Sequence, residues 1–570
     1  MNPFLEHQAF LTRRQFFSRG AMGLGTTALA ASLAPLAPVT AAATAERSEP
    51  EFGIMLNDDG GQSFTDIDPK RSEAALRAKI RSLEGTAVRT LIYQVVAGSE
   101  IALYPTKVGS AWGWRKAPGE SAPPWDKQMP FLRAAAAKGL DAGRTAGEEA
   151  RAMGLRFMPA YRMNDAHFSS KPFDHPATGR FWIENHERFK IGQAPSERMQ
   201  FVANLLDYSH AEVRAHRLAI VREIIGRYAD IMDGVQLDFM RQPYLFPPGT
   251  GEARQDLMTE FIAQVRAKLD EAGKQQGRFL CLSVRVPPTL PGCRWAGLDV
   301  KAWLQRRLVN VLVLSPSMTL AHDMPVDEFV ALAEPTGAKV YPAVFRQTPF
   351  IWPFTTEPSA DSYRRRPSRV VTAAQVRGAA LNYLPMGAAG FELFNFNLPP
   401  ASFTLDAIAA LANPRNGQRI YAITQAYASD REDTEYRKQI PVVLSPAATA
   451  ELTLIVGENL AERDLRNRTH AALRLGLHGL NKLQPNIRIE VNGHPIYDGP
   501  VAQIATSVSG RESQPSKLNP PRVETYLQVR LTDGAIFRAG RNKLSLRLRA
   551  PDARASVQVV EVQLAVLDDR

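Results

Sequence analysis

The sequence predicts an α/β protein: a TIM (β/α)8 barrel over residues 50–412, followed by an all-β, jelly-roll-like sandwich over residues 413–570. Two observations lead to this prediction. Short apolar runs alternate with segments of helical periodicity between about residues 52 and 396. After residue 413 the chain changes to short alternating segments separated by turn residues. Strands that alternate with helices favour a parallel sheet, and eight such units are the number that closes a barrel.

The barrel strands are predicted from short apolar runs bounded by polar segments. The eight expected strands are Phe52–Leu56, Thr90–Val96, Arg156–Arg162, Gly234–Asp238, Leu280–Val286, Val309–Ser315, Lys339–Phe345 and Gly390–Phe394. The helices expected between them are Ser72–Leu83, Ala142–Met153, Ala211–Tyr228, Glu252–Glu271, Val300–Arg307, Val326–Ala333 and Thr372–Tyr383. A doubly wound open sheet is the alternative, but no glycine-rich phosphate-binding fingerprint follows the first strand.

The C-terminal strands are predicted from period-two alternation between Asn, Gly, Pro and Asp turns. They are Glu451–Val456, Ala472–Leu477, Asn486–Val491, Thr525–Leu531 and Val557–Val566. Residues 489–494 and 537–544 resemble strand-and-turn segments of jelly-roll accessory domains in carbohydrate enzymes. This part of the chain contains no tryptophan, so structural support is favoured over strong stacking on a sugar.

Residues 1–45 are interpreted as a twin-arginine export signal. Arg13 and Arg14 precede Phe16 and Phe17, and an Ala/Gly-rich apolar run and small residues follow. The run is too short and too rich in Ala and Gly for a membrane anchor, and no later stretch approaches 18 apolar residues. The expected location is therefore periplasmic or secreted, with no transmembrane segment after signal cleavage.

The net charge of +11 is spread thinly along the chain. Its one dense basic run, Arg364–Arg366, has no interleaved aromatic residues that could stack on bases, so no nucleic-acid partner is expected. The positive charge leaves open a weak preference for an acidic glycan or an anionic cell surface. The two cysteines, Cys281 and Cys293, are not needed as a disulfide in a domain of this size. The oligomeric state is not readable from the sequence.

The segment Gly234–Arg241 indicates where chemistry gathers, because it ends a predicted strand with Asp238. Active sites of (β/α)8 barrels lie at the carboxyl ends of the strands. Side chains of barrel strands alternate between the axis and the helical layer. This alternation places a set of polar residues toward the axis: Arg162, Asn164, Gln236, Asp238, Arg285 and Glu392. A paired ion network that only closes the barrel mouth would give the same pattern.

A carboxylate pair can hydrolyse a glycosidic bond when one group is ionised and the other protonated. Asp238, with arginines nearby, is predicted to be the nucleophile or the group that stabilises the transition state. Glu392 is predicted to be the general acid, because Phe391, Phe394 and Phe396 could raise its pKa. Three aspartates are alternatives for the acid/base role: Asp165, Asp323 and Asp58.

Six of the seven tryptophans follow predicted barrel strands, and flat aromatic rings at a cleft suit the apolar face of a sugar. These six are Trp112, Trp114, Trp125, Trp182, Trp295 and Trp352. Some of them are expected only to anchor long loops. The predicted substrate-binding residues are Asn57, Arg162, Asn164, His167, Gln236, Arg241, Arg285, Trp112, Trp114, Trp182 and Trp352.

Three segments, 161–167, 206–214 and 233–241, together resemble exported glycoside hydrolase-like barrels described as glycosyl hydrolase family 10-like. The resemblance covers about residues 50–410 and implies a TIM barrel with a carbohydrate substrate. It does not supply a mechanism, because family 10 xylanases have Asn-Glu where this chain has Leu237-Asp238. An aspartate at the end of this strand is similar to the nucleophile of α-galactosidase-type retaining enzymes. The Asp-x-Asp-x-Glu pattern of chitinase-like barrels is absent.

The expected function is therefore an exported glycoside hydrolase that cleaves O-glycosidic bonds in a poly- or oligosaccharide, without a cofactor. A non-catalytic glycan-binding protein on the same barrel is the main alternative. A metal-dependent hydrolase is less favoured, because Asp165, His167 and His175 are accompanied by no His-x-x-x-His pair and no cysteine cluster. A serine hydrolase is disfavoured, because the Gly-x-Ser-x-Gly elbow is missing.

Overall fold

A computed structural model describes most of the chain from residue 51 onward. The described residues are 51–58, 72–121, 125–165, 173–195, 197–316, 319–346, 370–396, 398–423, 439–463, 465, 469–480, 485–501, 523, 525–550, 552 and 554–568. The predicted export signal, His167 and Trp352 lie outside these residues, as does the basic run at 364–366.

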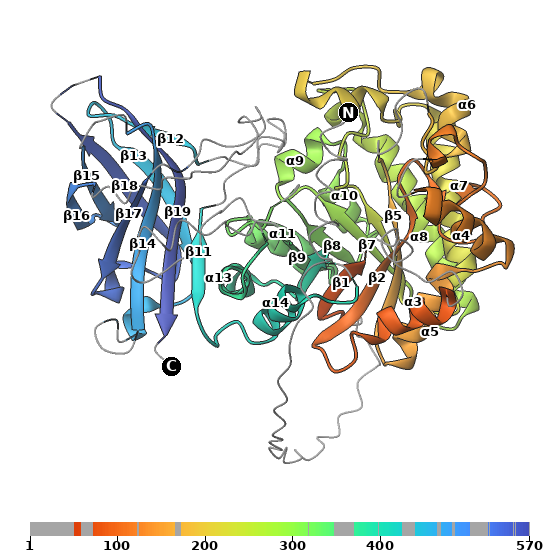
Figure 1. Ribbon diagram of the computed structural model, residues 1–570, viewed down its shortest axis with the longest axis horizontal. Coiled ribbons are helices and arrows are strands. Elements are labelled where there is room, and N and C mark those ends of the chain that lie inside the picture. Colours follow the sequence, from red (N-terminus) through yellow and green to blue (C-terminus); the bar gives the residue numbers. More distant parts are fainter. Residues whose placement is uncertain are drawn as a thin grey trace, which may run out of the picture. The chain divides into compact units, whose positions relative to one another are not determined.

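Eight parallel strands form the barrel, in the spatial order in which they follow along the chain (Figure 1). They are β1 (Ile54–Asp58), β2 (Val88–Ala97), β5 (Arg156–Arg162), β6 (Gly234–Asp238), β7 (Cys281–Val286), β8 (Val311–Leu314), β9 (Lys339–Phe345) and β10 (Phe391–Phe394). Strand β1 pairs with both β10 and β2, and this double pairing closes the sheet. The predicted (β/α)8 barrel is confirmed.

Helices follow the strands, as the apolar periodicity predicts. They are α3 (Ser72–Arg81), α5 (Ala142–Ala152), α7 (Ala211–Tyr228), α8 (Gln255–Gln275), α10 (Val300–Gln305), α11 (Val326–Ala333), α13 (Ala373–Tyr383) and α14 (Ser402–Ala412). The bounds of α7 and α11 are those predicted, whereas α14 was not predicted. No helix in the described part of the chain is both long enough and apolar enough to span a bilayer.

The connections after β2, β5 and β7 contain additional elements. These are β3 (Ile101–Ala102), β4 (Ser110–Ala111), η2 (Pro118–Ser121), α4 (Trp125–Ala137), α6 (Arg180–Phe189), η3 (Glu197–Asn204) and α9 (Leu290–Trp295). Shorter 3-10 turns are η4 (Glu252–Arg254), η5 (Glu334–Thr336) and η6 (Leu384–Met386). In a (β/α)8 barrel, connections after strands build the face that carries the active site.

The inside of the barrel is divided into an apolar part and a polar part. The apolar part is formed by Phe52, Met55, Ile92, Met158, Ala160, Cys281, Val311, Val313, Tyr341 and Ala343. Closer to the carboxyl ends of the strands the inward side chains become polar, including Asn57, Gln236 and Glu392, all buried. Alternate residues such as Leu282 and Val284 pack in the larger core between strands and helices. The inside of an eight-stranded barrel is normally packed with apolar side chains. The buried polar residues at one end of this barrel are therefore the feature that needs explanation.

The C-terminal part is all-β, as predicted, and consists of two antiparallel sheets. One sheet contains β11 (Arg419–Ala422), β12 (Val442–Leu444), β14 (Thr469–His478), β17 (Thr525–Leu531) and β19 (Val557–Asp568). The other contains β13 (Ala450–Val456), β15 (Asn486–Val491), β16 (His494–Pro500) and β18 (Gly540–Arg549). Alternating residues from both sheets, for example Leu473 and Leu546, share one buried apolar core, which is the packing of a sandwich.

Helix α13 contributes to the packing of both parts of the chain. Leu381 belongs to the apolar core of the sandwich, although it lies on a barrel helix. Asn382 Nδ2 donates to the carbonyl oxygen of His322 at 2.7 Å and to that of Ile455 at 3.2 Å. Gly378 approaches β11 so closely that an added Cβ would lie 1.9 Å from the Ile420 carbonyl oxygen.

Candidate active site

Neighbouring barrel strands align their polar inward residues in register. Gln236 is paired with Ser283, and Asp238 with Arg285, across β6 and β7. On the other side of β6, Arg162 is paired with Asp238. Because inward positions recur every second residue, these pairs form rows of polar side chains inside the barrel.

Glu392 lies at the centre of an amide network. Gln236 Nε2 donates to Glu392 Oε2 at 2.6 Å, and Asn57 Nδ2 donates to Glu392 Oε1 at 3.1 Å. Asn57 Nδ2 also donates to Gln236 Oε1 at 3.0 Å, and Gln236 Nε2 lies 3.3 Å from Ser283 Oγ. The side chains of β1, β6, β7 and β10 are therefore joined around one buried carboxyl group.

Asp238 forms a buried ion pair with Arg285. Arg285 Nη1 donates to Asp238 Oδ1 at 2.8 Å, and the backbone N–H of Met240 donates to the same oxygen at 2.8 Å. Asp238 Oδ2 has no hydrogen-bond partner among the described residues. One oxygen of the carboxylate is thus fixed by two donors, while the other accepts no hydrogen bond from the described residues.

Arg285 contacts both carboxyl groups, because its Nε lies 3.9 Å from Glu392 Oε1. Burial raises the pKa of Glu392 to about 7, against the opposing effects of the Arg285 charge and the hydrogen bond from Gln236. The negative charge of Asp238 acts in the same direction as burial. Near neutral pH the site therefore combines an ion-paired Asp238 with a Glu392 that exchanges a proton.

A second ionic group lies at the end of β5. Arg162 Nη1 lies 3.3 Å from Asp165 Oδ2, and Arg241 Nε lies 4.0 Å from the same oxygen. Burial lowers the pKa of Arg162 to about 10, and the neighbouring charge of Arg241 adds to that effect. Asp165 is buried between two guanidinium groups, and that environment suits a carboxylate better than a proton donor.

The other two candidate acids lie elsewhere. Asp58 ends β1 with the opposite parity to Asn57, and it is buried. Asp323 is only half-buried and lies close to Tyr383 of α13. The pKa of Tyr383 is raised mainly by the burial of its own hydroxyl, and the charge of Asp323 adds to this effect. Glu392 and Asp238 share the guanidinium of Arg285. Asp165 and Asp238 both feel the charge of Arg162, which forms its ion pair with Asp165.

Asn164 connects two loops at the barrel mouth. Its Nδ2 donates to the carbonyl oxygens of Leu206 at 3.0 Å and Tyr244 at 2.7 Å. Both amide hydrogens are therefore engaged, whereas its Oδ1 accepts no hydrogen bond from the described residues.

The predicted aromatic rim differs in detail from the expectation. Trp182 lies in α6 rather than in a loop, has none of its surface exposed, and stacks on His186 with 5.5 Å between ring centroids. Trp112 packs against the barrel core and is half-buried. Trp114 is also half-buried; its Nε1 donates to the Thr178 carbonyl oxygen at 3.2 Å, and the guanidinium of Arg180 lies 5.1 Å from its ring. Trp114 thus remains partly exposed, whereas Trp182 is fully buried.

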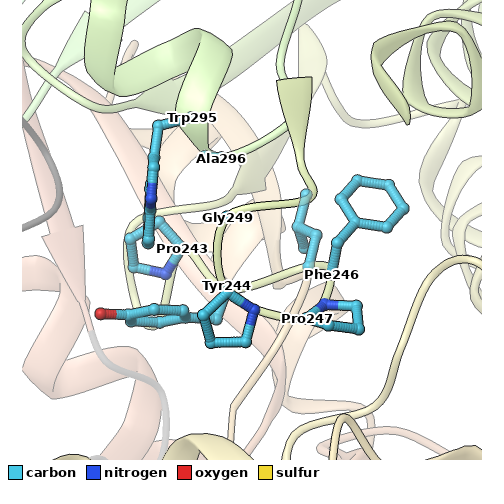
Figure 2. A pocket seen from close by; sticks show the side chains of 9 residues that line it. Pro243, Tyr244, Phe246, Pro247, Gly249, Trp295 and Ala296 are labelled. Atoms are coloured by element: carbon cyan, nitrogen blue, oxygen red, sulfur yellow. The ribbon is translucent and has the colours of Figure 1, made fainter. Parts of the chain in front are cut away.

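A small pocket in the loops after β6 and β7 is lined by Tyr244, Phe246 and Trp295 (Figure 2). None of the three was among the predicted substrate-binding residues, although Trp295 was one of the tryptophans expected at the cleft. Trp295 and Tyr244 meet edge to face, with 4.8 Å between ring centroids. Prolines 243, 247 and 248 complete much of the lining, and the empty volume is about 170 Å³. The run of aromatic and proline residues after Asp238 is the sequence signal that could have indicated this pocket.

In the parts of the chain that the structure describes, no three His, Cys, Asp or Glu side chains gather as metal ligands would. Cys281 and Cys293 are both buried and form no disulfide.

No protein-family model matches the chain, and no curated protein matches its sequence. Among solved structures, a cycloisomaltooligosaccharide glucanotransferase from Paenibacillus sp. is 11% identical with a TM-score of 0.33, over 90% of this chain and 57% of its own. This chain therefore spans little more than half of that protein. A chitinase from Chromobacterium violaceum and a glycoside hydrolase family 18 N-acetylglucosaminidase from Paenibacillus barengoltzii are each 10% identical with TM-scores of 0.31, over 63% of this chain and 98% of theirs. Likeness at this level says nothing about substrate or reaction.

Proposed function

We propose that the protein is a glycoside hydrolase in which Glu392 is the general acid and Asp238 is the catalytic carboxylate. The observation that carries the proposal is the pair of carboxyl groups on one guanidinium at the polar end of the barrel. Asp238 is ion-paired with Arg285, while burial raises the pKa of Glu392 to about 7. A carboxylate paired with an arginine, beside a carboxyl group that keeps its proton near neutral pH, is what acid-assisted glycoside cleavage requires.

In the proposed reaction Glu392 transfers its proton to the glycosidic oxygen as the bond from that oxygen to the anomeric carbon breaks. The positive charge that develops on the sugar ring is stabilised by the Asp238 carboxylate. Asp238 then either forms a covalent bond to the anomeric carbon, which water later hydrolyses, or takes a proton from the attacking water. Asn57 and Gln236 keep the Glu392 carboxyl group oriented throughout.

Neither carboxyl group is exposed in this conformation, so turnover requires a second conformation in which the mouth is open. The same burial favours a second candidate, a glycan-binding protein whose polar cluster only stabilises the barrel. A closed and largely hydrogen-bonded network has a purely structural use as well as a catalytic one.

Substitutions at the two carboxyl groups separate these candidates. The variants are Glu392→Gln and Asp238→Asn, and the control is Glu561→Gln in the sandwich, another buried carboxyl group paired with an arginine. Reducing-sugar release from a panel of plant, bacterial and fungal polysaccharides, together with release of nitrophenol from nitrophenyl glycosides, measures turnover. The hydrolase proposal expects a loss of at least about 100-fold in both site variants and none in the control. Unchanged turnover in both site variants, or binding without turnover in the native protein, would support the glycan-binding candidate.

The stereochemical outcome tests which role Asp238 has. Proton NMR of the first-formed product distinguishes a retained from an inverted anomeric centre. Retention corresponds to Asp238 as nucleophile, with carboxyl groups about 5 Å apart, and inversion to a water between groups about 6.5–9.5 Å apart.

We also propose that the protein is exported through its twin-arginine signal, which is supported by the order of charged, apolar and small residues in 1–45. The test is the double substitution Arg13→Lys and Arg14→Lys followed by cell fractionation. Retention of the variant in the cytoplasm is expected, and export equal to that of the native protein would contradict the proposal.

A further inference from the structure

We propose that Arg285 is a positioning residue that sets the arrangement of the Asp238 and Glu392 carboxyl groups and does not bind substrate. Its importance for turnover rests on the proposed function. Its geometric role can be tested without a substrate.

The two terminal nitrogens and one flat face of the Arg285 guanidinium are in contact with protein groups. Nη1 donates to Asp238 Oδ1 at 2.8 Å, and Nη2 donates to Ser315 Oγ at 2.7 Å. The ring of Phe394 lies against the flat face, with its centroid 3.4 Å from Cζ. The side chain is 1% exposed. Arg285 Nε has no hydrogen-bond partner among the described residues and lies 3.9 Å from Glu392 Oε1. The guanidinium is therefore held by protein groups and is closed off from a sugar by its burial.

These contacts select which oxygen of Asp238 is available. Arg285 and the Met240 backbone N–H both bind Oδ1, and Oδ2 has no partner among the described residues. A carboxylate fixed through one oxygen presents the other in a defined direction. Such orientation by neighbouring groups is what a reactive carboxylate needs to meet a substrate in a productive geometry.

Arg285 also faces Glu392, with its Nε 3.9 Å from Glu392 Oε1. The other groups that act on Glu392 are the Asp238 charge and the Gln236 amide from β6 and the Asn57 amide from β1. A further positive charge, Arg162 of β5, acts on Asp238. Arg285 is therefore the cation that touches both carboxyl groups, and its charge opposes the effect of burial on Glu392.

Ser315, which follows β8, fixes the far end of the guanidinium. Its hydroxyl donates to the Pro316 carbonyl oxygen at 2.9 Å, so its lone pairs are directed to accept from Arg285 Nη2. The positioning path thus runs from β8 through Ser315 and Arg285 to the two carboxyl groups.

The test is the protonation midpoint of Glu392, measured by infrared spectroscopy of the full-length protein. The protonated carboxyl band is assigned by subtracting the spectrum of Glu392→Gln, and it is followed between pH 4 and 10. Arg285→Gln removes the charge. The matched control is Arg474→Gln, since Arg474 is also fully buried, lies over a tyrosine ring and is paired with a glutamate.

Arg285→Gln is expected to raise the midpoint of Glu392 by about one pH unit or more, the effect of removing an adjacent opposite charge, while Arg474→Gln leaves it unchanged. An unchanged midpoint in folded Arg285→Gln overturns the proposal. If that variant does not fold, the test uses Ser315→Ala. This substitution keeps the charge of Arg285 but removes the hydroxyl that accepts from its Nη2. The midpoint of Glu392 is then expected to rise, by less than in Arg285→Gln. No shift in Ser315→Ala would then overturn the proposal.

The two proposals fail separately. A shifted midpoint without hydrolysis of any glycoside overturns the hydrolase function and leaves the positioning role intact. Hydrolysis of a glycoside with an unchanged Glu392 midpoint in Arg285→Gln supports the hydrolase function and overturns the positioning role. When both hold, the alkaline limb of the pH–activity profile moves upward in Arg285→Gln together with the infrared midpoint.

Discussion

Gln236 Nε2 lies 2.6 Å from Glu392 Oε2, although β6 and β10 are not neighbours in the sheet. The contact therefore crosses the inside of the barrel rather than following its wall. With Asn57 bonded to both side chains, the three residues span the lumen at one level. This level separates the apolar interior from the mouth, so any substrate is expected to meet Glu392 from the carboxyl ends of the strands.

The pKa of Glu392 predicts a specific dependence of stability on pH. The folded protein retains this proton up to about pH 7, whereas the unfolded chain loses it near pH 4.5. The free energy of unfolding is therefore expected to fall as pH rises through this window, by roughly 3 kcal/mol in total, and to be constant above it. Urea unfolding of the native protein and of Glu392→Gln at pH 5, 6, 7 and 8 measures the difference. A difference between the two proteins that does not change with pH would contradict the prediction.

Glu100 should behave in the opposite way. Burial raises its pKa, but the charges of Arg217 and His216 outweigh burial, so the folded-state pKa lies below the ordinary value. Its contribution to stability is present at neutral pH and is lost in acid, as the pH falls through the depressed folded-state pKa. Glu100→Gln leaves the buried Arg217 without its anion and should cost about 3–5 kcal/mol at pH 7. Urea unfolding at pH 7 and pH 3 checks this, and the loss should be smaller at pH 3.

Two asparagines of similar bonding provide a matched pair. Asn164→Ala removes the hydrogen bonds to the carbonyl oxygens of Leu206 and Tyr244, at an expected cost of about 2–4 kcal/mol. Asn382→Ala removes the hydrogen bonds to the carbonyl oxygens of His322 and Ile455 and should cost a similar amount. Limited digestion with chymotrypsin distinguishes the local effects of the two substitutions. Faster cleavage near Tyr244 is expected in Asn164→Ala alone, and equal cleavage in both variants would show that Asn164 does not hold that loop.

Replacing two helical glycines with alanine should change the stability of the protein in opposite directions. An added Cβ at Gly378 would lie 1.9 Å from the Ile420 carbonyl oxygen, so the helix and β11 must separate. We expect a loss of about 3 kcal/mol or more. Gly226 in α7 has nothing within 4 Å of the added atom, and alanine there should stabilise by about 0.5–1 kcal/mol. Thermal unfolding of both variants checks the signs, and a neutral Gly378→Ala would contradict the close packing of α13 on β11.

The barrel was predictable because buried strands leave a simple pattern in the sequence. Arg156–Arg162, Gly234–Asp238 and Lys339–Phe345 have the predicted bounds, since each is an apolar run limited by polar or turn residues. Helix α14 was missed: its sequence, Ser402–Ala412, is apolar on more than one face and shows little periodicity. The inward parity of Asp238, Arg285 and Glu392 followed from strand alternation alone.

The partners within the site were less predictable. Strand parity brings Arg285 to the level of Asp238, but it does not say whether its donors face a carboxylate or a substrate. The hydrogen bond from Arg285 to Ser315 could not be predicted, because Ser315 follows the end of β8 and strand alternation does not determine where its side chain points. Trp182 was expected at the rim because it follows β5, and the formation of α6 instead turns it into the core.

Leu381 has a consequence for how this protein could be rearranged in evolution or by design. The apolar core of the sandwich includes this side chain from a barrel helix, about 30 residues before the change in composition near residue 413. Cutting the chain near residue 413 would remove Leu381 from the apolar core of the sandwich and expose it on the surface of the barrel. The sandwich is therefore not an interchangeable cassette: grafting it onto another barrel would require carrying the α13 surface with it.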